Sequence, residues 1–223
     1  MLFLVEKKVI LVYNVFKLLK NLKEVRLMEA TTIKKVVAMG IGAAIYIVLS
    51  RFVAIPTPIP NTTLQVTFAF LALMAFIYGP AVGLGIGFIG HTLNDISGYG
   101  SVWFSWVAAA AFFGLATGFL GKIVKIENFN GAKIVKFIVG EVIISLISWV
   151  VLAPIIDIAI YKEPEAKAFA QGVTAALGNM IVVAILGTIL IFAFSLLIGI
   201  GSAAAVSLKL GMKDREEAER FLG

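Results

Sequence analysis

The sequence of 223 residues contains no cysteine and a single histidine, and only 14% of its residues are charged. Without cysteine, the chain can form no disulfide, catalytic thiolate or cysteine metal cluster. Soluble domains carry about 25% charged and roughly 45–50% apolar residues, whereas 61% of this chain is hydrophobic. This composition excludes both a soluble enzyme and an intrinsically disordered chain. We predict an integral membrane protein.

Long apolar stretches divide the chain into candidate membrane spans. The dipeptide Gly79-Pro80 between the second and third stretches is typical of a tight turn. Because one span needs about 20 residues, the length leaves room for six spans and for no separate nucleotide-binding domain. The predicted fold is therefore all-α, an integral membrane bundle of six transmembrane helices. The stretches cover approximately residues 36–55, 64–78, 81–93, 102–120, 137–160 and 172–199.

The distribution of Lys and Arg predicts how these spans are oriented. Eight of them precede the first span, four lie between the fourth and fifth spans, and four follow the sixth. Only Lys162 and Lys167 lie in the loops of the other side, with Arg51 near a helix end. Because positively charged loops stay in the cytoplasm, we expect both termini to be cytoplasmic. The protein is expected in the cell (plasma) membrane as a multi-pass protein.

Three segments differ in composition. Residues 1–27 place Leu11, Val15 and Leu18 at helical spacing between lysines, which is typical of an amphipathic helix on the inner leaflet. The alternative is a mis-assigned start, with translation beginning at Met28. Residues 28–200 are the predicted six-helix membrane domain, and residues 201–223 are a predicted charged cytoplasmic tail.

Glycines recur at short intervals, but one apparent motif is misleading. Residues 85–90 match the dinucleotide pattern G-x-G-x-x-G, yet they lie inside an apolar span rather than at a strand-to-helix turn. Gly79, Gly83 and Gly87 recur every four residues, a spacing that lets two helices approach closely in lipid. We expect this series to pack within the bundle. A similar stripe on the first span could equally meet another subunit.

Ionisable side chains at membrane depth cost about 2.5–3.5 kcal/mol on insertion scales, so each is a functional candidate. Four qualify: His91, Asp95, Glu141 and Asp157. His91 and Asp95 lie one helical turn apart and can pair. Glu141 follows Lys136 by five residues, and we expect it to pair with a lysine of the inner loop.

Aromatic rings, amides and carboxylates converge near the outer ends of the spans. The loop 56–63 holds three of the six prolines, so it should be stiff and extended. The segment 94–106 holds two of the three tryptophans. An aromatic belt at the membrane interface would explain the tryptophans alone. Convergence of all these groups instead predicts a small-molecule pocket, mostly apolar with a few directed polar groups.

The chain also resembles a known family along most of its length. The similarity covers roughly residues 30–200 and is distributed over many positions. The residues that carry it are Arg51–Pro56, Pro60-Asn61-Thr62, Tyr78-Gly79-Pro80, Gly87–His91, Asp95, Tyr99-Gly100, Trp103–Trp106, Ala153-Pro154, Asp157, Tyr161, Pro164, Lys167–Phe169 and Gln171-Gly172. On these residues the chain resembles the substrate-binding S components of energy-coupling factor (ECF) vitamin importers, in the riboflavin-type or uncharacterised branch.

The resemblance implies a membrane subunit that captures a water-soluble vitamin outside and delivers it by tilting in the membrane. Its partners would be a transmembrane coupling (T) subunit, two ATPase subunits and the lipid bilayer, with no nucleic acid. The branch does not determine the vitamin. A cobalamin-class ligand is slightly favoured, with a flavin, a pyrimidine or pyridoxine as alternatives.

This function assigns two sets of residues and no catalytic residue, metal ligand or cofactor. Small residues on the first helix belong to the docking surface in the family, which implies a coupling-subunit interface at Ala38, Gly40, Gly42 and Ala44. The candidate substrate-binding residues are Asn61, Thr62, His91, Asp95, Tyr99, Trp103, Trp106, Asp157 and Asn179.

Two other function classes fit the sequence less well. A proton-coupled secondary transporter would use His91, Asp95 and Glu141 as a relay, but such proteins usually carry an internal repeat and midplane charges. The halves of this chain show no convincing repeat. An intramembrane enzyme would need a motif such as HExxH or a nucleophile elbow, and the sequence has neither.

Overall fold

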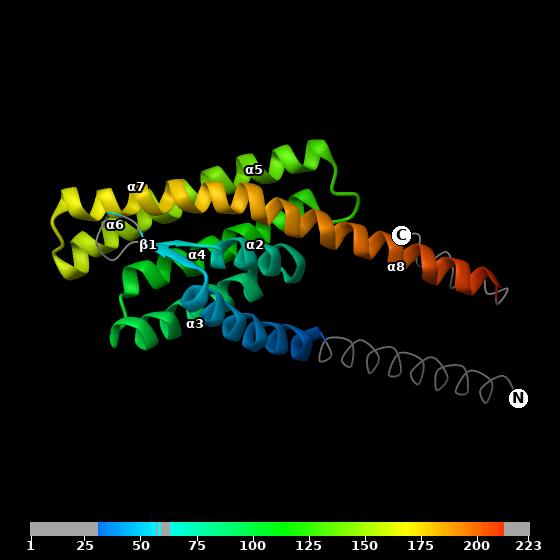
Figure 1. Ribbon diagram of the computed structural model, residues 1–223, viewed down its shortest axis with the longest axis horizontal. Helices are drawn as coiled ribbons and strands as arrows, with labels where there is room; N and C mark the ends of the chain where they lie inside the picture. The colour runs from blue at the N-terminus through cyan, green and yellow to red at the C-terminus, as the bar shows by residue number, and fades with distance from the viewer. Residues whose placement is uncertain (1–30, 57, 59–62, 212–223) are drawn as a thin grey trace, which may run out of the picture. The chain divides into compact units, whose positions relative to one another are not determined.

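The computed structural model describes residues 31–56, 58 and 63–211 (Figure 1). The predictions for residues 1–27, Asn61 and Thr62 lie outside this part of the chain. The chain divides into two compact units, Met1–Ala38 and Met39–Gly223. Every contact discussed below lies within the second unit.

Helices account for nearly all of the described residues. A helix over Thr31–Phe52 comes first, and two longer helical runs, Gly131–Tyr161 and Glu165–Gly211, end the described chain. Some turns in these runs are π-helical and are labelled η. The elements are β1 (Ala54–Pro56), β2 (Thr63–Gln65), α2 (Thr67–Tyr78), α3 (Pro80–Tyr99), α4 (Phe104–Val124), α5 (Gly131–Ser145), η1 (Leu146–Leu152), α6 (Ala153–Ile156), η2 (Asp157–Tyr161), α7 (Glu165–Val182), η3 (Val183–Gly187) and α8 (Thr188–Gly211).

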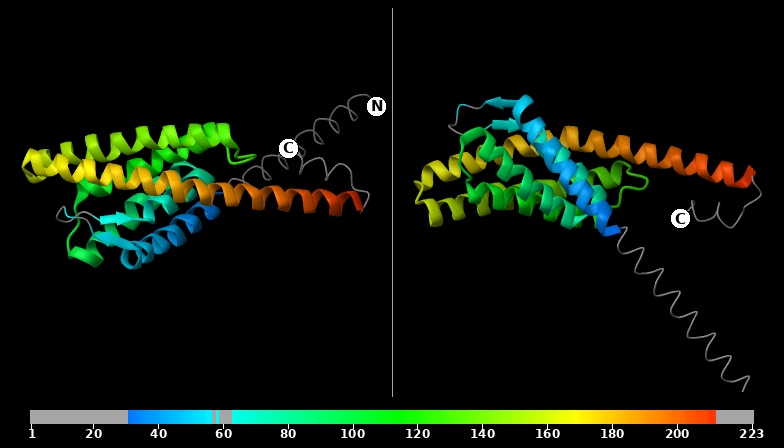
Figure 2. Two further views of the ribbon diagram at one scale, coloured as in Figure 1. Left: turned by 45° about the horizontal axis from the view of Figure 1, so that its top comes forward. Right: turned by 90° about the horizontal axis from the view of Figure 1, so that it is seen from below.

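The predicted all-helical membrane class is confirmed for the described residues. Each predicted apolar stretch falls largely within one helical run, and four runs are long and apolar enough to cross a membrane. The sequence did not predict the small antiparallel ribbon of β1 and β2, which pairs Ala54 with Gln65 and Pro56 with Thr63. The run Glu165–Gly211 is continuous, and α8 lies in line with α7 in both views of Figure 2.

The predicted turn between the second and third spans is confirmed. Tyr78 ends α2, Gly79 alone connects the helices, and Pro80 is the first residue of α3. Gly79 has φ +89°, a conformation that side chains with a Cβ rarely adopt. Proline suits the first position of a helix because its missing N–H has no partner there.

The glycine series of the third span packs inside the bundle, as predicted. A Cβ at Gly83 would meet the backbone carbonyl of Gly114, and a Cβ at Gly87 would meet that of Ala110. Both partners lie on α4, so α3 and α4 approach each other backbone to backbone. This contact places the end of α3 beside the start of α4, where the site described below is built.

Replacing Gly83 by valine is expected to destabilise the protein by roughly 1–3 kcal/mol, since the added atoms must push α3 from α4. The apparent unfolding temperature in detergent measures the effect. Gly199→Val is the matched control, because a Cβ at Gly199 meets nothing within 4 Å. Equal unfolding temperatures for the two variants would contradict close α3–α4 packing.

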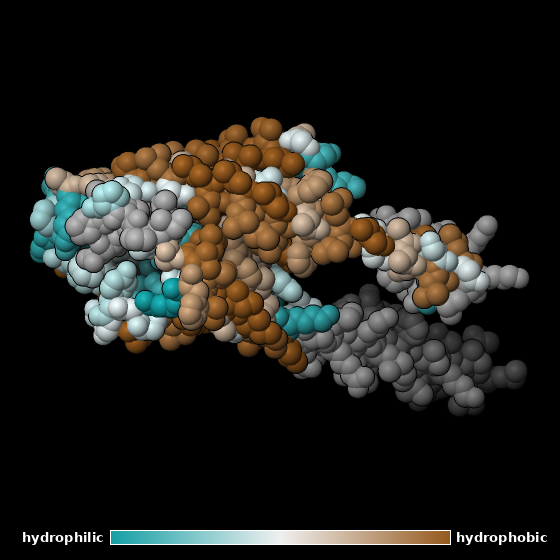
Figure 3. Space-filling view, viewed as in Figure 1, coloured by the Kyte–Doolittle hydropathy of each residue, from teal (hydrophilic) through white to brown (hydrophobic). Residues whose placement is uncertain are grey.

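The surface is apolar along the helices and hydrophilic near their ends. In Figure 3, apolar side chains cover the middle of the visible face, and hydrophilic ones gather around α6 and the start of α7. Large side chains such as Val139, Ile185 and Ile189 are exposed on α5, η3 and α8. An apolar surface of this extent matches lipid rather than water.

Candidate functional site

A hollow lies where α3 ends and α4 begins, and β2, α2, η1 and α7 complete its wall. It has a volume of about 210 Å³ and is open to the surrounding solvent. This volume lies at the small end for a small-molecule site. The lining residues are Thr63, Gln65, Phe68, His91, Asn94, Asp95, Tyr99, Ser101, Trp103, Trp106, Trp149, Lys167, Gln171, Ala175 and Asn179.

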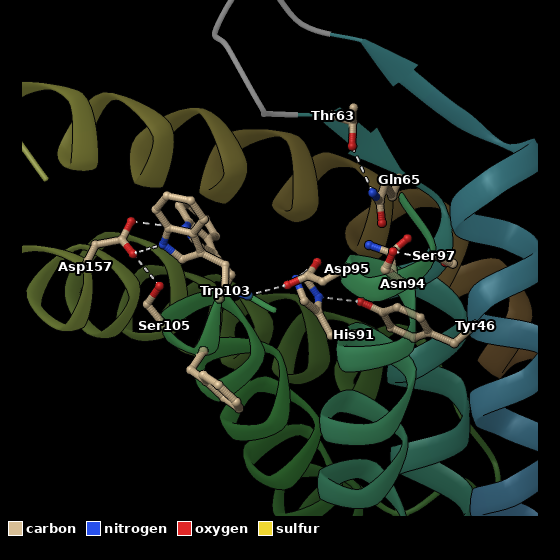
Figure 4. Close-up of polar contacts among 12 residues, drawn as sticks. Tyr46, Thr63, Gln65, His91, Asn94, Asp95, Ser97, Trp103, Ser105 and Asp157 are labelled. Atoms are coloured by element: carbon tan, nitrogen blue, oxygen red, sulfur yellow. Dashed lines mark hydrogen bonds and ion pairs between the residues drawn. The ribbon is translucent and has the colours of Figure 1, made fainter. Parts of the chain in front are cut away.

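Asp157 holds two indole rings in the wall of the hollow (Figure 4). The indole N–H of Trp103 donates to Asp157 Oδ1 at 2.5 Å, and that of Trp106 donates to Oδ2 at 3.1 Å. The hydroxyl of Ser105 also donates to Oδ1. Asp157 is buried and does not line the hollow. It therefore fixes the orientation of both rings and occupies their only polar atoms, which leaves ring faces as the surface available to a ligand.

The position of Asp157 follows from the helix around Pro154. Proline has no N–H to donate within a helix, and the π-helical segments η1 and η2 lie on either side of α6, which contains Pro154. The N–H of Ala153 accordingly reaches Ser148 O, five residues back. Widened turns of this kind recur at functional sites, and here η2 begins with Asp157 itself.

A second polar chain joins the first helix to the α3–α4 connection. The hydroxyl of Tyr46 hydrogen-bonds His91 Nδ1 at 3.0 Å, and His91 Nε2 lies 3.6 Å from Asp95 Oδ1. The predicted pairing of His91 with Asp95 is thus confirmed. Asp95 Oδ2 accepts the backbone N–H of Trp103 at 3.0 Å. The carboxylate therefore holds the residue at which the aromatic wall starts.

Aromatic rings form most of the apolar wall. Trp106 stacks on Trp149, with ring centroids 6.0 Å apart and planes 20° apart. Phe68 packs edge-on against Trp149 at 4.8 Å. Trp149 and Phe68 are buried, so they are core residues that also reach the hollow. Offset-stacked and edge-to-face pairs are the arrangements that aromatic side chains favour, and a planar ligand ring can join such a set.

Carboxamide side chains supply directed polar groups. Asn94 and Asn179 line the hollow although each residue is only about 4–5% exposed. The amide N–H of Gln65 donates to Thr63 Oγ1 at 2.8 Å, and Gln65 Oε1 has no hydrogen-bond partner among the described residues. A carboxamide both donates and accepts, so these groups can orient a ligand that carries adjacent N–H and C=O groups.

The charged residues of the lining are paired with one another or with neighbours. Asp95 faces His91, and Lys167 Nζ lies 2.8 Å from Glu163 Oε2. A buried charge without a partner is costly, so this lining favours a ligand without net charge.

The hollow brings together six of the nine predicted substrate-binding residues: His91, Asp95, Tyr99, Trp103, Trp106 and Asn179. Asp157 lies behind the wall, and the remaining two are outside the described residues. The prediction did not single out Gln65, Phe68 or Asn94. Phe68 lies in a long apolar stretch, where nothing in the pattern distinguishes it from ordinary core residues. The only sequence feature that could have identified Asn94 is its position directly before Asp95.

The stripe of small residues on the first helix faces two ways. Gly40 and Ala44 are exposed and one turn apart, and a Cβ at Gly40 meets nothing within 4 Å. Gly42 is buried, and a Cβ there would meet Ile86 of α3. Ala38 is the last residue of the first unit. A test of an outward docking face therefore belongs at Gly40 and Ala44, since a larger residue at Gly42 would disturb the bundle itself.

The prediction that Glu141 pairs with a lysine of the inner loop is wrong. Glu141 is 1% exposed, and neither carboxylate oxygen has a hydrogen-bond partner among the described residues. The contacts between basic and acidic side chains found in this part of the chain are His91–Asp95 and Lys167–Glu163. Helix α5 turns the Glu141 side chain into the bundle, whereas Lys136 is exposed.

Comparison with known proteins gives one consistent result. Residues 30–196 match the family model described as ECF-type riboflavin transporter, S component. A UPF0397 protein of Lactobacillus johnsonii is 49% identical over 169 residues, which cover 75% of this chain and 91% of the relative. UPF0397 proteins of Streptococcus agalactiae and an Exiguobacterium species are 47% and 44% identical over 170 residues, 75% of this chain and 93% of each relative. No solved structure matches the chain.

Proposed function

The chain belongs to the family of ECF-type riboflavin transporter S components, and from this premise we propose that it captures a planar, uncharged vitamin for an ECF importer of the cell membrane. An S component is a substrate-binding subunit of a transporter, so the chain is not an enzyme. The observation that carries the proposal is the hollow itself. Its wall contains the indole rings of Trp103 and Trp106, which Asp157 holds by hydrogen bonds, and carboxamide side chains.

The hollow opens to the outside in this proposal. The hollow lies at the start of α4. At the opposite end of α4 are Lys122 and the C-cap residue Lys125, and α5 begins there with Lys133 and Lys136 in its first turns. At 1.5 Å per residue, the 21 residues of α4 span about 30 Å, the thickness of the hydrocarbon core. The positive-inside rule then supports six spans with both termini in the cytoplasm and the vitamin site outside.

The nature of the wall favours a single planar ring system. Ring faces of Trp106 and Trp149 can stack on such a ligand, and Asn94, Asn179 and Gln65 can pair with its polar edge. A flavin fits this description and agrees with the name of the family model, and a pyrimidine or pyridoxine fits it as well. The cobalamin-class ligand that was slightly favoured above is several times larger than these vitamins. It would have to occupy the mouth of the hollow as well as its interior.

Delivery requires partners that power it. In the proposed cycle the loaded S component docks on a T subunit carrying two ATPase subunits and tilts so that the hollow reaches the cytoplasm. The apolar side surface supports such a motion, because few polar groups would have to leave water as the helices turn in lipid.

Thermal stabilisation by a panel of vitamins tests the function. A ligand that binds only the folded state stabilises it by about 2.7 kcal/mol at a concentration of 100 Kd. We expect one of riboflavin, a pyrimidine, pyridoxine or cobalamin to raise the unfolding temperature of the purified chain. Vesicles containing the chain alone should show no uphill uptake under a proton gradient. Gradient-driven accumulation would instead support a secondary transporter.

Trp106→Ala is expected to weaken vitamin binding roughly tenfold, since the loss of one stacking face costs about 1–3 kcal/mol. Titration of intrinsic fluorescence or calorimetry measures the dissociation constant. Phe104→Ala is the matched control, because Phe104 starts the same helix but is exposed and does not line the hollow. An equal loss in both variants would show that Trp106 acts only as an interfacial aromatic residue.

A further inference from the structure

Glu141 lies about one third of the way along the helical run Gly131–Tyr161, away from the hollow. In a membrane, this position brings a carboxyl group to the depth of the apolar span, where ionisable side chains are rare and mark functional sites. The proposed vitamin capture makes no use of it.

Two hydroxyl groups accompany the carboxyl group. The side chain of Thr117 on α4 lies beside it. Ser145 follows one turn later on the same face of α5. All three residues are at most 1% exposed. Thr117 is close enough to act as a hydrogen-bond partner of the carboxyl group, but none of the carboxylate and hydroxyl oxygens forms a hydrogen bond of normal geometry among the described residues. These buried oxygen atoms are therefore available to a ligand that the protein chain itself does not provide.

The chemistry of these atoms selects the class of ligand. Carboxylate and hydroxyl oxygens are hard ligands, which suit hard metal cations rather than soft ones. A hydroxyl group rotates freely enough to turn a lone pair toward a cation. The helix widens at η1, immediately after Ser145, and π-helical turns of this kind recur at functional sites.

The charge balance selects the valence. When it is ionised, Glu141 brings one negative charge, and no lysine, arginine or histidine of the described residues pairs with it. A monovalent cation would neutralise the site, whereas a divalent one would leave a buried net charge, which is costly.

We infer that Glu141, Thr117 and Ser145 form a binding site for one monovalent metal cation, with Na⁺ as the ion that suits so closely packed a place. The site lies within the contact between α4 and α5, so a bound ion would tie these helices together. This inference does not rest on the proposed vitamin or on the orientation in the membrane.

The test uses the purified full chain in detergent without vitamin. Its unfolding temperature is measured in NaCl, KCl and choline chloride at equal ionic strength. We expect Na⁺ to raise the unfolding temperature saturably and K⁺ to raise it less, with about one radioactive Na⁺ bound per chain in a scintillation assay. Identical unfolding temperatures in all three salts would overturn the inference, because a permanently protonated Glu141 needs no cation.

Variants locate the effect. Glu141→Gln should abolish the Na⁺-dependent shift, and the exposed Glu127→Gln should keep it. If Glu141→Gln does not fold, Thr117→Val and Ser145→Ala replace it, and each should raise the Na⁺ concentration of half-maximal stabilisation about tenfold or more, the equivalent of 1.4 kcal/mol. A Na⁺ shift unchanged in these variants would also overturn the inference. Vitamin binding is measured separately, so either proposal can fail alone.

Discussion

Asp157→Ala is expected to lower the affinity for the vitamin at least about a hundredfold, which corresponds to 2.7 kcal/mol. The carboxylate accepts hydrogen bonds from Trp103, Trp106 and Ser105, and hydrogen bonds to charged groups contribute about 1.5–3 kcal/mol each. Without it, two indole N–H groups lose their acceptor and both rings are free to turn out of the wall. Calorimetric titration of the purified variant measures the loss.

Two controls separate this effect from a general loss of folding. Glu165→Gln removes an exposed carboxylate at the start of α7 and should leave the dissociation constant unchanged. Asp157→Asn keeps one oxygen acceptor for an indole and should fall between alanine and wild type. A folded Asp157→Ala protein that binds the vitamin normally would show that the indole rings need no support from behind.

The double substitution of Gly40→Trp and Ala44→Trp is expected to abolish uptake by the assembled importer. The affinity of the isolated chain for the vitamin should stay within about twofold, because surface changes away from a site shift free energies by only a few tenths of a kcal/mol. Both positions are exposed, and a Cβ at Gly40 meets nothing within 4 Å. Small residues at helix interfaces in lipid allow close approach of a partner. Two indole rings there would hold the T subunit away.

Vesicles that contain the T and ATPase subunits provide the transport assay, with ATP hydrolysis as a second readout. Ile189→Trp is the matched control, because Ile189 is also exposed but lies on α8. Uptake by this control should stay at the wild-type level. Normal uptake by the doubly substituted protein would remove Gly40 and Ala44 from the docking surface.

The helical layout could be predicted from the sequence because it follows from local patterns. Long apolar runs, the Gly79-Pro80 turn and the four-residue glycine spacing each act through neighbouring residues of one helix or one turn. The ribbon of β1 and β2 was not predicted, since three-residue strands leave almost no periodicity to detect.

The sequence predicted most of the residues that form the site, but not what each of them contacts. Asp157 was expected to touch the ligand, yet it lies behind Trp103 and Trp106 and binds their N–H groups. Glu141 was expected at the interface with a lysine, yet α5 turns it toward Thr117. In both cases the outcome depends on the direction in which the helix turns the side chain, and for Asp157 the preceding π-helical segment η1 changes that rotation.

The sequence by itself determined that this chain is helical, belongs in lipid and carries aromatic and amide residues near one set of helix ends. Apolar runs and turn residues suffice for that, because the bilayer requires each span to satisfy its own backbone hydrogen bonds. Only the tertiary structure decided which of those residues meet. Residues separated by more than fifty positions, such as Trp103 and Asp157, come together through the packing of α4 against the run Gly131–Tyr161, and no local pattern encodes that contact.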